Sequence, residues 1–165
     1  RPGIVSTSRI VSDLAARVEV LSDTEEEPNG SLVRSIGGAC RAAVARAGIE
    51  HDVKFACLLT DGPRIRRLNR QFRSIDRETD VLAFPRGDGS PGGDIAIALD
   101  LARTTAAGNC ATTEAEVAYL AAHAALHLLG HDHHTDDDYR KMRDEEDGIL
   151  AMMGLANPRR STEII

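Results

Sequence analysis

The sequence has no tryptophan and only five aromatic residues, two tyrosines and three phenylalanines. With so few large rings available, the core must be built mainly from aliphatic side chains. Cysteine is also scarce, since Cys40, Cys57 and Cys110 are scattered, form no C-x-x-C pair and leave an odd count. We therefore expect reduced structural cysteines and no disulfide framework.

Long apolar runs are missing as well. No window reaches the roughly 18 consecutive apolar residues that a transmembrane helix requires. The first residues also lack the apolar stretch of a signal peptide. These two absences predict a cytoplasmic protein with no membrane partner.

The length of 165 residues suits one domain with one hydrophobic core. We expect a single domain over residues 1–165. Residues 1–12 are polar and uneven and are expected to form a loose lead-in. Residues 157–165 are expected to form a polar tail.

Apolar periodicity predicts about four strands and four or five helices. The expected strands are residues 16–21, 52–60, 79–85 and 94–99, and the expected helices are residues 32–47, a segment from Pro63 onward, residues 100–107, 114–130 and 134–155. Ser31 and Thr113 are the expected N-caps, and Gly48 and Gly130 the expected stop signals. Strands and helices do not alternate strictly, which favours an α+β fold with a mixed sheet over a doubly wound one.

A net charge of −6 argues against a nucleic-acid partner, but its distribution does not. Residues 64–77 hold six arginines and a single aspartate. In the predicted helix, Ile65, Leu68 and Phe72 share one face, while Arg66, Arg70 and Arg73 form a stripe on another. The stripe is either a solvated helix face or a surface that binds a polyanion. Exposed charges are screened over about 8 Å, so a polyanion docked there would feel the stripe more than distant acids.

Five of the six histidines fall within twelve residues, in the stretch "HAALHLLGHDHH" from His123 to His134. His123 and His127 are four residues apart on a predicted helix, so both imidazoles leave the same face. Gly130 permits a left-handed turn that would bring His133 back toward them. Three imidazoles suit zinc and leave a coordination position open for chemistry. The non-functional alternative is a group of solvated histidines at a frayed helix end.

The remaining polar residues of this stretch have less defined roles. His131 and His134 are expected to be neighbours of the site, because each would have to displace His133 or face away from it. Asp132 either orients a ligand imidazole by accepting its second N–H or forms a local turn.

The histidine pattern predicts that residues 1–165 form a single metal-dependent hydrolase domain. Two kinds of hydrolase could use such a site. Metzincin proteases share the histidine spacing, but they carry a glutamate as general base where this chain has Ala124. Phosphodiester hydrolysis instead needs positive charge near the developing phosphoryl charge, which Arg73 at the end of the stripe could supply.

Three segments resemble those of the YbeY endoribonuclease (rRNA maturation factor) family. They are "NRQFRSIDRETDVLAFP", "GDIAI" and above all "HAALHLLGHDH", in the family's order and approximate spacing. The resemblance covers about two thirds of the chain. It departs from the family pattern at Ala124 (usually glycine), Ala83 (usually serine) and His131 (commonly tyrosine).

This resemblance implies a zinc-dependent, single-strand-specific endoribonuclease of the bacterial cytoplasm. Its roles would be maturation of the 3′ end of small-subunit ribosomal RNA and ribosome quality control, with RNA and the small ribosomal subunit as partners and no DNA partner. By its motifs, His123, His127 and His133 would bind one Zn²⁺, and Arg73 would be the functional arginine. Two alternatives remain open: a metzincin-like metallopeptidase, and a non-catalytic, zinc-stabilised ribosome-assembly or RNA-binding factor.

Overall fold

A computed structural model describes residues 9–12 and 16–160. Its strands are β1 (Arg9–Ser12), β2 (Ala16–Ser22), β3 (Val53–Thr60), β4 (Val81–Pro85) and β5 (Gly92–Ala98). Its helices are α1 (Gly30–Arg46), α2 (Gly62–Arg73), α3 (Leu99–Gly108), α4 (Thr113–Leu128) and α5 (Asp136–Met152). None of the helices in this part of the chain is long and apolar enough to cross a membrane.

The five strands form one mixed sheet in the order β1-β2-β3-β5-β4. β2, β3 and β5 run parallel, and the edge strands β1 and β4 pair antiparallel with their neighbours. The predicted α+β class and mixed sheet are confirmed. The fifth strand, β1, lies where a loose lead-in was predicted, so that prediction was wrong for residues 9–12, and residues 1–8 lie outside the described part. Only two apolar residues, Ile10 and Val11, mark this strand in the sequence, which is too short a pattern to recognise.

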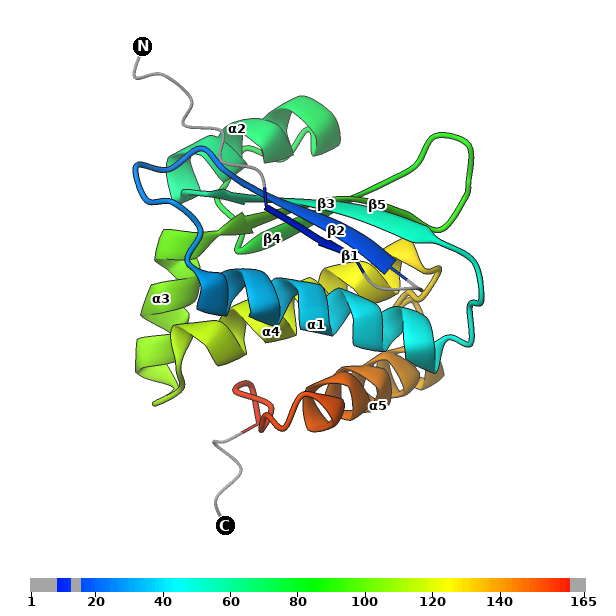
Figure 1. Ribbon diagram of the computed structural model, residues 1–165. Helices are drawn as coiled ribbons and strands as arrows, with labels where there is room; N and C mark the ends of the chain where they lie inside the picture. The colour runs from blue at the N-terminus through cyan, green and yellow to red at the C-terminus, as the bar shows by residue number, and fades with distance from the viewer. Residues whose placement is uncertain (1–8, 13–15, 161–165) are drawn as a thin grey trace.

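The two faces of the sheet are covered unequally (Figure 1). α1, α3 and α4 lie below it, and α5 lies lower still, packed against α1 and α4, whereas α2 alone lies on the opposite face. The main core fills the space under the covered face and is aliphatic, as predicted, since Phe55 is the only aromatic residue buried in it among those that the structure describes. A smaller cluster, built around Ile65 and Leu82, holds α2 against the other face. All three cysteines are free, as expected.

Helix boundaries differ slightly from the prediction. Asn29 caps α1, its side chain accepting the Leu32 N–H at 2.8 Å, so Ser31 is not the N-cap. Thr112 caps α4 by accepting the Ala115 N–H at 3.1 Å, so Thr113 is not the N-cap either. In both places a second good capping residue stands close by, and sequence preference alone cannot choose between them.

Residues 157–160 were predicted to belong to a polar tail, and they do contact the body of the protein. The Arg159 guanidinium donates to Glu116 at 2.9 Å and to Asp80 at 2.8 Å. Glu116 lies in the first turn of α4 with a solvent exposure of 0%. Arg160 forms an ion pair with Asp147 of α5. The segment thus neutralises a buried carboxylate, and residues 161–165 lie outside the described part of the chain.

Candidate metal centre

The long helix α4 supplies the first two imidazoles of the site. Its small alanines pack closely against the core, with Ala121, Ala122, Ala124 and Ala125 all buried. This fixes the helix rotation and brings His123 and His127 to the partly exposed edge. The ring centroids of the two histidines lie 4.8 Å apart. The predicted sharing of one helix face is therefore confirmed.

The end of α4 places the third imidazole. Gly130 has a φ of 100°, a left-handed value that favours glycine. The Gly130 N–H donates to the His127 carbonyl at 3.1 Å, and the His131 N–H donates to the Leu126 carbonyl at 3.0 Å. These two bonds form a Schellman motif, which ends the helix and turns the chain back. The His133 ring consequently lies 5.1 Å from the His127 ring, centroid to centroid.

The three imidazoles converge as predicted. One potential ligand atom from each of His123, His127 and His133 lies within 4.8 Å of the other two. Nitrogen ligands sit about 2.0–2.1 Å from a zinc ion, so modest side-chain rotations would bring all three to one ion. The donor set therefore fits a divalent cation of borderline softness, and three protein ligands leave at least one coordination position for a substrate or water.

The environment keeps His127 in the form that binds metal. Burial, followed by the charges of His123 and His133, lowers its pKa to about 4 from the ordinary 6.5. The charge of Arg73 acts in the same direction. His127 is therefore neutral at neutral pH, with a lone pair available to a cation.

Glu146 of α5 belongs to the site, and sequence reasoning missed it. Its Oε2 lies 3.1 Å from Nδ1 of His123, and the residue is only 4% exposed. A carboxylate accepting the Nδ1–H leaves Nε2 of His123 for a cation. A signal was present, because Glu146 lies four residues after Met142 and three before Ile149, both on the buried face of α5.

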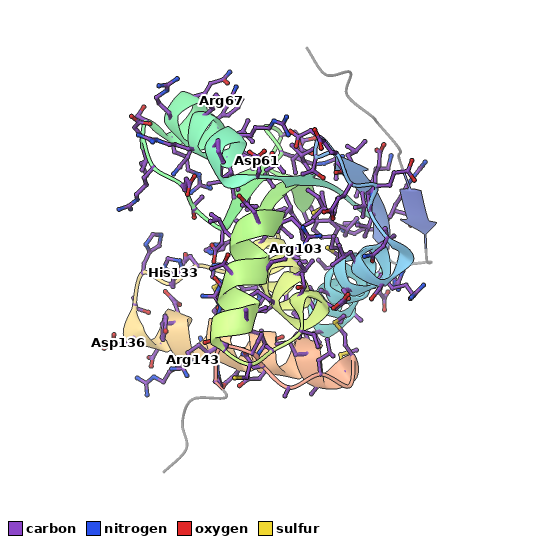
Figure 2. The ribbon with its side chains drawn as sticks, turned by 90° about the vertical axis from the view of Figure 1, so that its left-hand side faces the viewer. Asp61, Arg67, Arg103, His133, Asp136 and Arg143 are labelled. Atoms are coloured by element: carbon purple, nitrogen blue, oxygen red, sulfur yellow. The ribbon has the colours of Figure 1, made fainter. Side chains whose placement is uncertain are left out.

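The other polar residues of the histidine stretch stay peripheral. Asp132 accepts the backbone N–H of His134 at 3.4 Å, which is the local-turn alternative for this residue. The ring of His134 is largely exposed. Figure 2 shows the labelled His133 on the loop that joins α4 to α5.

The arginine stripe divides into one residue at the site and two outside it. Arg73 lines a cleft of about 360 Å³ together with the three histidines and with Val81, Leu82, Ala83 and Pro85 of β4. Its Nη2 donates to the Ala83 carbonyl at 2.7 Å, which holds the guanidinium at the cleft wall. Arg66 is paired with Asp76 at 2.9 Å, and Arg70 is exposed on α2. Neither Arg66 nor Arg70 lines the cleft.

The cleft contains no acidic side chain among the described residues that line it. Ala124, at the position of the metzincin glutamate, is 1% exposed and offers only a methyl group. Peptide hydrolysis by that mechanism therefore lacks its general base. What the cleft does combine is a cation site and a fixed guanidinium, the pair suited to an anionic substrate.

Fold and site together define an α+β protein with a candidate divalent-cation centre at an open, arginine-flanked cleft. Residues 19–154 match the family "Endoribonuclease YbeY", and the chain belongs to this family. An endoribonuclease YbeY from Desulforamulus reducens is 36% identical over 135 residues, covering 76% of this chain and 88% of that protein. One from Rhodopseudomonas palustris is 37% identical over 142 residues, covering 81% and 73% respectively.

A solved structure supports the fold independently. The solution structure of TM1509 from Thermotoga maritima aligns with a TM-score of 0.57 at 23% identity, covering 90% of this chain and 96% of that one. At this level of identity the likeness concerns the arrangement of helices and strands.

Proposed function

We propose that the protein is a metal-dependent endoribonuclease that cleaves single-stranded RNA, with one Zn²⁺ bound by His123, His127 and His133. The observation that carries the proposal is the convergence of these three imidazoles with Arg73 at one cleft. Membership of the endoribonuclease YbeY family supports RNA as the substrate. On the motif resemblance, we extend the proposal to maturation of the 3′ end of small-subunit ribosomal RNA and to ribosome quality control, with the small ribosomal subunit as a partner in the bacterial cytoplasm.

Each residue has a distinct task in this proposal. A bound divalent ion supplies Lewis acidity that polarises a phosphate oxygen or a water. Glu146 holds the His123 ring so that one nitrogen faces the centre. Arg73, anchored by the Ala83 carbonyl, binds the phosphate next to the scissile bond and offsets its growing negative charge.

The other arginines of the stripe bind the strand further from the cleft. Arg70 is exposed and contributes an electrostatic contact with a phosphate. Arg66 lies one turn earlier on α2 and is partly neutralised by Asp76. In this proposal Arg73 acts at the cleft, and Arg70 and Arg66 extend the positive charge along α2.

The test combines metal analysis with cleavage of a labelled single-stranded RNA, before and after chelation. The parent protein is expected to carry about one zinc ion per chain and to lose cleavage on chelation. His127→Ala should lose bound metal and cleavage together, whereas His134→Ala should retain both, because His134 is exposed and outside the ligand set. Cleavage by His127→Ala at the parental rate in metal-free buffer would refute the proposal.

The same preparation separates the two rival functions. A peptidase would digest casein and leave RNA intact. A non-catalytic factor with a structural zinc would cut neither, and chelation would sharply lower its melting temperature. For the proposed enzyme, chelation should abolish RNA cleavage and leave most of the fold, because a large core lies away from the histidines.

A further inference from the structure

A second cavity, of about 620 Å³, lies on the face of the sheet that α2 only partly covers. Leu58 of β3, Ala96 of β5, and Leu68 and Phe72 of α2 contribute to its largely apolar lining. Asp94 is the one charged residue among its described lining residues. We call this cavity the sheet groove.

Phe72 is the unusual residue of the sheet groove. It follows Ile65 and Leu68 on one face of α2, but Ile65 is fully buried and Phe72 is 61% exposed. Its ring meets Phe84 of β4 edge-on, with centroids 5.4 Å apart and planes at 66°. This contact orients the ring and leaves much of its surface open. An exposed aromatic ring with a fixed orientation is a stacking platform for another flat ring.

The sheet groove adjoins the cleft that Arg73 and the three histidines line. Pro85, the last residue of β4, lines both cavities. Phe72 and Arg73 are successive residues, with Phe72 in the groove and Arg73 in the cleft. The groove and the cleft therefore meet at the end of β4, where one strand of RNA could contact both.

The two cavities differ in charge and therefore favour different chemical groups. Arg73 and a cation at the histidines would attract phosphate groups to the cleft. In the sheet groove, Asp94 repels phosphate, and the apolar walls favour a neutral aromatic group. A single RNA strand carries both kinds of group, phosphates along its backbone and flat bases beside them.

We propose that the sheet groove is a nucleobase subsite, in which a base adjacent to the cleaved phosphodiester stacks on the Phe72 ring. The inference rests on the proposed function, because it takes single-stranded RNA as the molecule in the cleft. Double-stranded RNA cannot use the subsite, since its bases are already stacked on one another. The groove thereby gives a physical basis for preference for single strands.

The test measures binding of a short, cleavage-resistant 2′-O-methyl oligouridylate to the metal-loaded protein by fluorescence anisotropy. Phe72→Ala and Phe72→Leu should each weaken binding by about tenfold, the effect typical of losing one stacked base. Phe72→Trp should bind within about twofold of the parent, because it restores a stacking face. Met152→Ala, which removes a similarly exposed apolar side chain on α5, is the matched control and should bind like the parent.

An abasic oligomer with the same backbone distinguishes stacking from other causes. On this probe the Phe72 variants should bind as well as the parent, because no base is available to stack. In cleavage of unmodified RNA, Phe72→Ala should raise KM with little change in kcat. The proposal is overturned if Phe72→Ala binds the oligouridylate like the parent, or if Phe72→Leu binds as well as Phe72→Trp. It is also overturned if the variants lose as much affinity for the abasic probe as for the oligouridylate.

The outcomes separate this inference from the proposed function. If the parent protein cleaves RNA and the Phe72 variants behave like it, the endoribonuclease proposal stands and the nucleobase subsite is refuted. A parent protein that neither binds nor cleaves RNA removes both. Phe72 variants that bind the oligomer normally but lose the small ribosomal subunit would assign the groove to a protein partner and overturn the proposal.

Discussion

Two walls of the cleft that Arg73 and the three histidines line are built in opposite ways. α4 supplies two histidines and buries eleven of its sixteen residues, so its position is set by the core. α2 supplies Arg73 and buries only three of its twelve residues. Figure 2 shows α2, with Arg67 labelled, projecting above the body of the molecule that holds the histidine loop. Two of the three candidate cation ligands thus stand on a helix that the core fixes in place, whereas Arg73 stands on a helix at the surface.

The largest expected difference between the two walls concerns stability. Leu120→Ala removes a buried side chain of α4 and should lower the free energy of unfolding by about 2–5 kcal/mol. Leu68→Ala makes the same change on α2, where the side chain is half-buried, and should cost clearly less. Urea unfolding of both variants measures the difference. Equal losses would contradict the division of the cleft into a core wall and a surface wall.

Arg73→Ala should separate cleavage from metal binding. Loss of a fixed cation at the phosphate should lower kcat by about a hundredfold to a thousandfold, as loss of a comparable transition-state donor does. Zinc content should stay at the parental level, because Arg73 lies on the other wall from the histidines. Single-turnover cleavage and elemental analysis provide the two measurements. Arg73→Lys, which keeps the charge but not the fork of donors, should recover only part of the rate. A variant that loses its zinc would show that the walls are not independent.

Glu146→Gln should weaken metal binding, the property that Arg73→Ala should leave unchanged. The amide keeps the shape but removes the negative charge that holds the His123 ring, so metal affinity should fall by about tenfold to a hundredfold. Competition with a chelating indicator measures this affinity directly. Glu145→Gln is the matched control, because Glu145 pairs with Arg46 on the surface. Equal metal affinity in the Glu146 variant and its control would exclude the orienting role.

The smallest effect is expected for Asp76→Asn on the surface wall. This change frees Arg66 from an exposed ion pair at 2.9 Å, and exposed pairs contribute only about 0.2–1 kcal/mol. RNA affinity should rise by less than about fivefold, and more at low salt than at high salt. Asp144→Asn, on the exposed part of α5, makes the same charge change away from the stripe. Anisotropy titrations at two salt concentrations would test this. An equal rise in RNA affinity in both variants would show that the net charge, and not the release of Arg66, causes the effect.

Local sequence pattern was enough to predict that the three histidines of the candidate metal centre lie together. The spacing of His123 and His127 depends only on helix geometry, and the return of His133 depends on the Schellman turn at Gly130. All of this information lies within eleven residues. Most strands and helices were likewise found from their own periodicity, with boundaries shifted by one or two residues where two capping residues stood together.

The features that were missed depend on contacts between distant segments. Glu146 meets His123 across 23 residues, and Arg159 meets Glu116 across 43. Neither contact can be predicted before the packing of α4, α5 and residues 157–160 is known. Phe72 was placed correctly on the apolar face of its helix, but that face is largely uncovered at this position. Periodicity describes one helix and does not reveal what lies opposite it.

The pairing of Arg159 with Glu116 also has a consequence for the order in which the chain can fold. Leaving a buried carboxylate without its partner costs about 3–5 kcal/mol. Burial of Glu116 in the first turn of α4 therefore becomes favourable only after Arg159 has been synthesised and has left the ribosome. Completion of the interior therefore waits for a residue that lies 43 positions farther along the chain.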